Sequence, residues 1–168
     1  QDAPVDVFGV GTSLVTGNPD AALDGVYKLA MFGGHPRIKL SETIAKITLP
    51  HKKQVYRMLD ESGNFTGSDV VSLSEEEMPG MMYHPFDPLK SLSVEQFGKE
   101  PLLHQVMTQG KRTTQKRNLP EIADYGQERL GKLPVEYKRF FFPHIYKVGL
   151  SKNLKEERDR IREKHKKR

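Results

Sequence analysis

The residues best suited to chemistry lie near the amino end, in the run Gly9-Val10-Gly11-Thr12-Ser13. A short β-prone run, Val5–Phe8, precedes them, so the glycines fall where a strand would end. Backbone N–H groups that no Cβ obstructs, together with two hydroxyls, are donors that can bind a phosphate at such a point. Because Gly-x-Gly is also common in ordinary turns, the spacing predicts either a phosphate site or a turn.

Two longer phosphate-binding signatures are not completed here. Leu14 stands where the dinucleotide-binding fingerprint needs its third glycine, and no Gly-Lys-Ser/Thr follows as in a Walker loop. The run is therefore neither of these motifs.

A second group of cations and hydroxyls gathers around Pro50. Such a group is either a phosphate-binding surface or an ordinary exposed face, and we interpret it as an exposed face. Its members are Lys39, Ser41, Lys46, Thr48, Lys53 and Arg57.

Neither a metal site nor an acid–base pair is indicated by spacing. The 6 histidines include no pair at metal-ligand spacing. The triplet Glu75-Glu76-Glu77 is typical of a solvated acidic turn rather than of a general acid with its base. We therefore predict no metal site and assign no catalytic residue.

Net charge is concentrated at the carboxyl end. The chain has 27 Lys and Arg against 22 Asp and Glu, a net charge of +5, and the segment 152–168 alone has nine basic and four acidic residues. Pairs four apart, such as Glu156/Arg160, favour a solvated helix there, with Leu154 and Ile161 as its apolar seam. A second basic cluster, within 111–117, lacks aromatic residues for stacking on bases, which indicates an exposed loop. We do not expect nucleic acid as a partner.

The composition excludes several classes of protein. Since the chain has no Cys, it has no disulfide framework, no Cys-ligated zinc, no iron–sulfur cluster and no thiol catalysis. No window approaches the roughly 18 consecutive apolar residues of a membrane-spanning helix. We expect a cytoplasmic protein without a membrane partner.

The elements that must position these residues are mainly hairpins. The runs 26–32 and 36–40 flank Gly33-Gly34, and the runs 54–59 and 67–73 flank a polar turn at 60–64, so two hairpins are predicted. Two other stretches have no hairpin pattern. Residues 74–88 are typical of a connection, and 102–107 form a helix or a strand.

The last third of the chain changes to helical periodicity. Asn118 is suited to be the N-cap of a helix that reaches Pro134, with Ile122, Tyr125, Arg129, Leu130 and Leu133 on one face. The run Phe140-Phe141-Phe142 indicates core or a docking edge. Asn153 and Glu156 form a predicted capping box for the final helix.

Four sequence blocks together resemble the C-terminal part of the nicotinate phosphoribosyltransferase family. They are Asp6–Thr16, Gly25–Leu29, Pro36–Ser41 and Lys46–Pro50. The resemblance continues more loosely through Glu100–Leu103 and Tyr137–Arg139 and so covers most of the chain. One departure is His51, because the family usually has Gly after this proline. We therefore question whether the tight turn at this position is kept.

The resemblance implies a fold of the α/β class with an α+β appendage. It implies the C-terminal portion of an irregular α/β barrel, as in type II phosphoribosyltransferases, followed by β-hairpins and helices. On this basis, 1–25 is expected to hold a late barrel strand and the glycine loop, 26–110 to be rich in hairpins, and 111–168 to be helical. The N-terminal half is expected to lie outside this chain.

The resemblance also implies an activity, which is condensation of nicotinate with phosphoribosyl pyrophosphate to nicotinate mononucleotide and pyrophosphate, coupled to ATP hydrolysis, in NAD biosynthesis. Gly9, Gly11 and Thr12 would bind the phosphate of the phosphoribosyl group, and Mg²⁺ would neutralise the leaving pyrophosphate. The family's catalytic residues lie upstream of the motif, so this chain alone is expected to be inactive. The family usually forms homodimers, in which Phe140–Phe142 would face a partner.

Two other functions stay open at this point. The first is a non-catalytic basic binding module for RNA or a protein partner. The second is the related nicotinamide-specific transferase, although the Gly-x-Gly-Thr pattern favours the nicotinate-specific enzymes.

Overall fold

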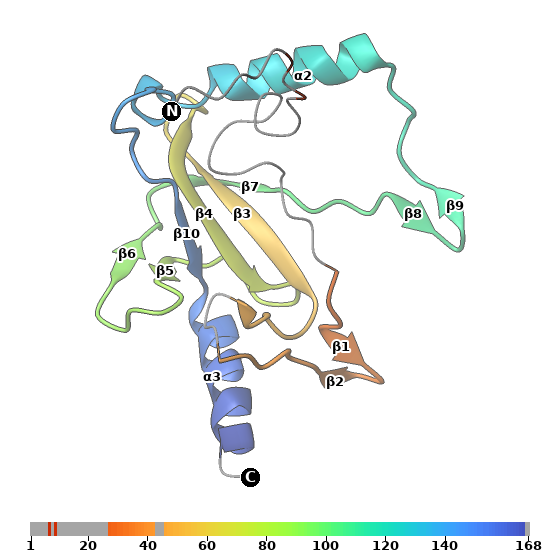
Figure 1. The fold of residues 1–168 in the computed structure, drawn as a ribbon, viewed down its shortest axis with the longest axis vertical. Coiled ribbons are helices and arrows are strands. Elements are labelled where there is room, and N and C mark those ends of the chain that lie inside the picture. The colour runs from red at the N-terminus through yellow and green to blue at the C-terminus, as the bar shows by residue number, and fades with distance from the viewer. Residues whose placement is uncertain (1–6, 8, 10–26, 43–45, 167–168) are drawn as a thin grey trace.

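The computed structural model describes Val7, Gly9 and residues 27–42 and 46–166. Within these residues, the body is a curled mixed sheet with α2 at one end and α3 at the other (Figure 1). From one edge to the other, the sheet consists of β6 (Ser91–Ser93), β5 (Met81–Tyr83), β10 (Lys147–Leu150), β4 (Phe65–Leu73), β3 (Lys53–Leu59) and β7 (Gly98–Pro101). The remaining elements are the strand pairs β1 (Met31–Phe32) with β2 (His35–Pro36) and β8 (Met107–Thr108) with β9 (Lys111–Arg112), the helices α2 (Leu119–Gly131) and α3 (Lys152–Lys166), and the short 3₁₀ helix η2 (Val135–Tyr137).

The structure confirms both predicted hairpins. β3 and β4 pair antiparallel, and in the turn between them the Asp60 carboxylate accepts the N–H groups of Ser62 (2.9 Å) and Asn64 (2.8 Å). β1 and β2 pair through the turn at Gly33-Gly34, where both residues have positive φ. This hairpin is shorter than its flanking runs predict, since each of its strands has two residues.

Two strands lie where the sequence indicates none. β5 forms inside the predicted connection 74–88, and β10 forms inside the segment expected to be helical. β10 is inserted between β4, to which it is parallel, and β5, to which it is antiparallel. Such a short strand has too few residues to display a period, so only its long-range pairing defines it.

The core is built from side chains of β3, β4 and β5 and of the residue that follows β6. Met58, Val70, Met82 and Val94 form one buried cluster, and Tyr56 with Phe97 packs against it. Burying an apolar side chain of this size stabilises a fold by roughly 1.5–3 kcal/mol. The cluster therefore anchors the centre of the sheet.

Helix α3 packs on this sheet through its predicted seam. Leu154 and Ile161 are buried, and α3 contacts β4 and β5. The predicted cap is wrong, however, because Asn153 lies inside the helix. The Ser151 hydroxyl caps α3 by accepting the N–H of Leu154 at 3.3 Å.

Helix α2 has its predicted cap but an open apolar face. The Asn118 carboxamide accepts the N–H of Glu121 (2.9 Å), and the Glu121 carboxylate accepts the N–H of Asn118 (2.8 Å), which completes a capping box. No residue of α2 is buried. The face that the sequence predicts is therefore present but is not covered by the described part of the chain.

The expected barrel strand at 5–8 lies outside the described residues, apart from Val7. What the structure establishes is a curled mixed sheet with few helices. Residues 102–106 belong to neither helix nor strand. Within the described ranges, no helix has the length and apolar character needed to cross a membrane.

Candidate functional site

Only one of the three predicted phosphate-binding residues lies in the described part of the chain. Gly9 is exposed, and a Cβ built on it would meet no atom within 4 Å. Gly11 and Thr12 lie outside the described residues. The phosphate loop therefore stays a prediction.

The cations and hydroxyls around Pro50 do not form one surface. The Lys53 ammonium donates to the carbonyls of Leu49 (3.0 Å), Pro50 (3.1 Å) and His51 (2.5 Å). Its burial lowers the pKa of Lys53. Lys53 thus holds the chain's turn into β3, and our interpretation of it as part of an exposed face is wrong.

Arg57, the other strand residue of that group, also has a structural partner. Its guanidinium donates two hydrogen bonds of 3.1 Å to the Asp69 carboxylate on β4, and Tyr146 donates a third to the same carboxylate at 2.8 Å. The hydrogen bonds that Arg57 donates to Asp69 are the main cause that raises the pKa of Arg57, and burial is the main cause that raises the pKa of Tyr146. Arg57 is therefore committed to a buried cluster rather than to a ligand.

A second ion pair extends this cluster to α2. Arg129 and Glu100 form a bidentate pair, with one bond of 2.8 Å and one of 2.5 Å. The guanidiniums of Arg57 and Arg129 lie over the Phe65 ring, at 4.6 and 4.5 Å from its centroid. No pattern in the sequence indicated a role for Asp69 or Tyr146, and Glu100 stood out only as the first residue of the loosely matching block Glu100–Leu103. A charged residue within the apolar run of β4 is a signal that could have identified Asp69.

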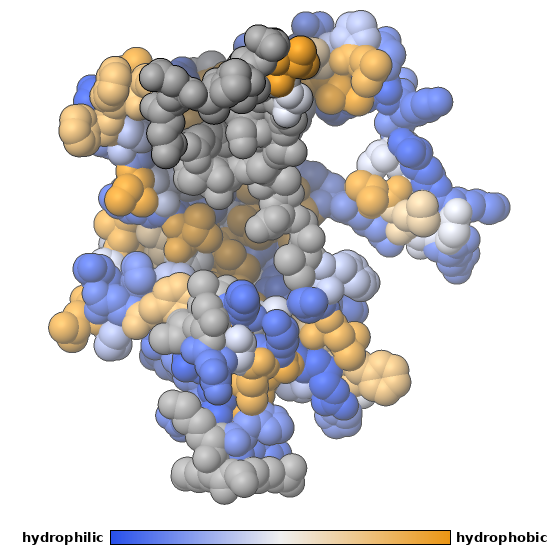
Figure 2. Space-filling view, in the orientation of Figure 1, coloured by the Kyte–Doolittle hydropathy of each residue, from blue (hydrophilic) through white to orange (hydrophobic). Residues whose placement is uncertain are grey.

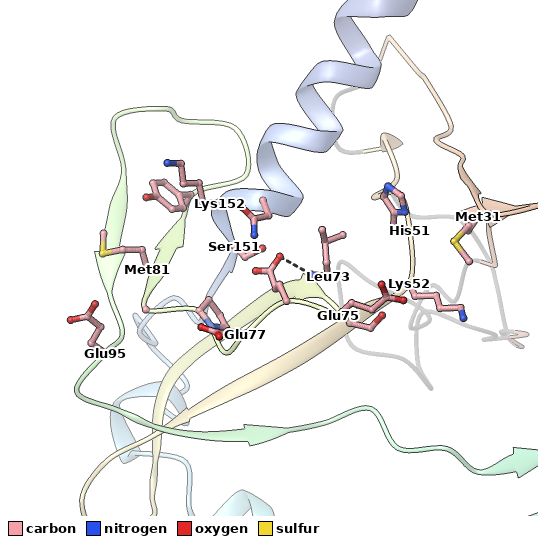
Figure 3. Close-up of a pocket in the computed structure, with 17 residues that line it drawn as sticks. Met31, His51, Lys52, Leu73, Glu75, Glu77, Met81, Glu95, Ser151 and Lys152 are labelled. Atoms are coloured by element: carbon pink, nitrogen blue, oxygen red, sulfur yellow. Dashed lines mark hydrogen bonds between the residues drawn. The ribbon is translucent and has the colours of Figure 1, made fainter.

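A hollow lies where β4, β5 and the start of α3 converge (Figure 3). It has a volume of about 1050 Å³. We call it the acidic hollow and define it by the residues that line it: Met31, Gly34, His51, Lys52, Leu73 to Glu77, Pro79 to Met81, Tyr83, Glu95 and Ser151 to Asn153.

Several elements position these side chains. The Ser151 N–H donates to the Val71 carbonyl at 2.9 Å, which fixes the start of α3 beside the end of β4. Glu76 accepts the N–H of Leu73 at 3.3 Å, which folds the acidic triplet back onto β4. Figure 3 shows Ser151 and Lys152 on the helix side of the hollow and Glu75, Glu77 and Glu95 across from them.

His51 forms the wall between the hollow and α3. Its φ is 64°, in the left-handed region that favours glycine, so the tight turn is kept although the residue is not Gly. Its N–H donates to the Ala30 carbonyl at 2.8 Å, and its Nε2 lies 3.2 Å from the Glu157 carboxylate on α3. Hydrogen bonds from Arg160 and then from His51 lower the pKa of Glu157 to about 2.

The charge of the acidic hollow does not suit a phosphate. Four glutamates line it, at 75, 76, 77 and 95, against Lys52 and Lys152. Like charges at this density would repel a phosphate or pyrophosphate. Among the described residues, no three His, Cys, Asp or Glu side chains are grouped so that they could hold a metal ion.

The basic residues of α3 are engaged by acidic neighbours on the same helix. Ion pairs join Lys155 and Arg158 to Asp159, and Arg160 to Glu157 rather than to the predicted Glu156. Arg158 is buried and donates to the Pro85 carbonyl at 2.6 Å. This pairing agrees with the interpretation of a solvated helix and does not favour binding to RNA.

Comparisons with known proteins agree on one family. Residues 52–158 match the model of the nicotinate phosphoribosyltransferase C-terminal domain. The chain is 35% identical to nicotinate phosphoribosyltransferase of Bos taurus, over 96% of this chain and 30% of that protein. It is 33% identical to the enzyme of the same name from Bacillus subtilis, over 91% of this chain and 33% of that protein.

A solved structure gives the same result. The crystal structure of human nicotinic acid phosphoribosyltransferase matches with a TM-score of 0.65 and 30% identity, over 83% of this chain and 27% of that chain. The chain thus spans about a third or less of the length of the relatives that it matches.

Proposed function

Because the chain belongs to the nicotinate phosphoribosyltransferase C-terminal domain family, we propose that it is the C-terminal part of an enzyme that joins nicotinate to the ribosyl carbon of phosphoribosyl pyrophosphate. The products are nicotinate mononucleotide and pyrophosphate, in a glycosyltransferase-type step of NAD biosynthesis. The observation that best supports the proposal is the family match over 52–158. The fold shared with the human enzyme adds to it.

In this proposal the described residues form a scaffold. Their strongest polar clusters, Arg57–Asp69–Tyr146 and Arg129–Glu100, are satisfied within the chain, and the acidic hollow repels phosphate. Binding of the substrate's phosphate falls to Gly9, Gly11 and Thr12, whose N–H groups and hydroxyl are donors suited to a fixed anion. Transfer at a cationic sugar carbon needs such positioning more than a nucleophilic side chain.

We also propose, from the resemblance, that the whole enzyme couples the reaction to ATP and uses Mg²⁺. The described residues do not fit that ion, since no group of three ligands converges among them. A cytoplasmic homodimer is proposed on the same ground.

The test is a chimera in which this chain replaces the C-terminal third of the Bacillus subtilis relative. We expect the chimera to form nicotinate mononucleotide and the 168-residue chain alone to form none. Gly11→Val should raise the KM for phosphoribosyl pyrophosphate at least tenfold. Gly126→Ala, a change in α2 where a Cβ meets open space, should leave it unchanged. Product formed by the chain alone, or an inactive but folded chimera, would contradict the proposal.

Two further measurements test the alternative functions. A preference for nicotinamide over nicotinate in competition would favour the related nicotinamide-specific transferase. Salt-dependent binding of the chain to RNA would favour the basic module, because phosphate contacts release counterions.

A further inference from the structure

An exposed aromatic loop lies between η2 and β10. Phe140, Phe141 and Phe142 are 92%, 75% and 93% exposed, and Ile145 is 86% exposed. We call these four residues the Phe patch. At 150–250 Å² for each aromatic side chain, the patch exposes roughly 600 Å² of apolar surface. That reaches the upper end of the 300–600 Å² typical of the largest patch on a soluble monomer, and a patch of that size marks an interaction site.

The Phe patch is presented by a loop whose base is fixed. Tyr137 donates to the Thr66 carbonyl at 3.2 Å, and the His144 N–H donates to the Glu136 carbonyl at 2.9 Å. The Tyr137 ring makes edge contacts with His144 and Tyr146, at centroid distances of 5.6 and 5.9 Å. The aromatic side chains therefore project outward because the fold holds both ends of their loop.

Phe142 has an unfavourable backbone conformation within this loop. Its φ is 51°, in the left-handed region that a bulky residue adopts at a cost in free energy. Its side chain is almost fully exposed, so the described part of the chain does not repay that cost through packing. Strain of this kind clusters at functional positions such as ligand clamps and switch regions.

The patch continues into an apolar groove beside β10. The groove has a volume of about 540 Å³, and Met82, Phe86, Leu92, Ile145 and Val148 supply its apolar lining. Figure 2 shows hydrophobic side chains gathered along the segment that leads into β10. The patch and the groove adjoin on one flank of the sheet, because Ile145 belongs to both.

We propose that this surface is covered by the portion of the longer enzyme that the relatives have and this chain does not include. The proposal rests on the proposed function. The chain spans 30% of the Bos taurus relative and 27% of the human structure, so most of each relative lies outside it.

The chemistry of the covering segment follows from the patch. It must present an apolar socket, since four adjacent apolar side chains need to leave water. Lys138, Arg139 and Lys147 flank the patch, so carboxylates at the rim of the socket would complement it. A second copy of this chain is the competing occupant, and the experiment separates the two.

The experiment is hydroxyl-radical footprinting with mass spectrometry, on the chain alone and on the chimera with the Bacillus subtilis enzyme. We expect the oxidation rate of Phe140, Phe141 and Phe142 to fall at least fivefold in the chimera. Leu89, which is 93% exposed and lies outside the patch, is the matched control and should be oxidised equally in both samples. The buried Met58, which does not line the groove, reports whether the fold is intact.

Equal oxidation of the Phe patch in both samples overturns the proposal. Protection that rises with the concentration of the chain alone, and that Phe141→Ser abolishes, also overturns it, because the occupant is then a second copy. If Met58 is oxidised in the chimera, its fold is not intact, and the chain is instead mixed with the separately produced N-terminal two-thirds. The same criteria then apply. Formation of nicotinate mononucleotide is measured on the same samples. Protection without activity refutes only the proposed function, and activity without protection refutes only this inference.

Discussion

Replacing Gly67 with Ala should destabilise the chain far more than the same change at Gly63, although both glycines lie in or beside the β3–β4 hairpin. The two residues have nearly the same backbone conformation, with φ of 77° and 78°. They differ in the space beside them. A Cβ on Gly67 would lie 2.0 Å from Cζ of Tyr137, whereas a Cβ on Gly63 would meet nothing within 4 Å.

The expected costs follow from these contacts. Both substitutions place a residue with a Cβ in the left-handed region, which costs about 1–2 kcal/mol. Gly67→Ala also displaces the Tyr137 ring, which loses its hydrogen bond to Thr66, about 1 kcal/mol, and its edge contacts with His144 and Tyr146, about 0.5–1.5 kcal/mol each. We therefore expect a loss of about 3–6 kcal/mol for Gly67→Ala and about 1–2 kcal/mol for Gly63→Ala.

The assay is urea unfolding of the 168-residue chain and its variants, with the m-value checked for a common unfolding transition. A double-mutant cycle with Tyr137→Ala isolates the close approach, because in that background Gly67→Ala should cost no more than Gly63→Ala. Equal free energies of unfolding for the two single variants would refute the reasoning. So would an extra cost at Gly67 that survives removal of Tyr137.

Three further predictions concern the ion pairs. His51→Ala keeps the left-handed backbone but loses the pair with Glu157, so the free energy of unfolding in urea should fall by about 1 kcal/mol. His51→Gly loses the same pair but relieves the backbone strain, so its free energy of unfolding should be nearly unchanged. Equal losses for the two variants would contradict this account. Folding lowers the pKa of Glu157 from 4.5 to about 2, so the unfolded chain binds more protons than the folded chain between these pH values. The ionised Glu157 therefore stabilises the fold above about pH 5, and this stabilisation is lost as the pH falls toward 2. Between pH 7 and pH 3, the unfolding temperature should fall less for Glu157→Gln than for the unsubstituted chain. An equal fall for both would contradict this role of Glu157. Arg129→Ala removes the ion pair that joins α2 to Glu100 on β7, so amide hydrogen exchange in α2 should become at least tenfold faster. The control Lys132→Ala loses only the exposed pair with Glu128 and should change the exchange rate little. Equal exchange rates for the two variants would show that the Arg129 pair does not hold the helix.

The candidate site shows how far residue types alone could be interpreted. Lys53 and Arg57 are cations near hydroxyls, and their residue types predicted an exposed face, whereas the structure engages both with partners inside the fold. The sequence could not indicate their partners, because Arg57 is 12 residues from Asp69 and Asp69 is 77 residues from Tyr146 along the chain. The sequence states which side chain is present at a position. The pKa of that side chain, and whether it is free to bind a ligand, depend on neighbours that only folding brings near.

The turn at His51 also depends on contacts that the local sequence does not indicate. The sequence departs from the family's glycine there, which raised doubt about the turn, yet the structure keeps the left-handed φ. The carbonyls around it are held by Lys53, and its ring lies against Glu157 on α3. Contacts from a distant helix stabilise a conformation that the local residue disfavours.

What the sequence by itself determined was local. The glycine pair between β1 and β2, the polar turn before β4, the Asn118–Glu121 capping box and the Leu154–Ile161 seam all depend on residues within a few positions of one another. Only the tertiary structure decided where β10 is inserted, that Ser151 rather than Asn153 caps α3, and that the Phe patch stays exposed. The physical reason is that turns, caps and amphipathic seams are stabilised by neighbours in sequence. Strand order, burial and charge pairing are instead set by contacts between distant segments, which no short period in the sequence encodes.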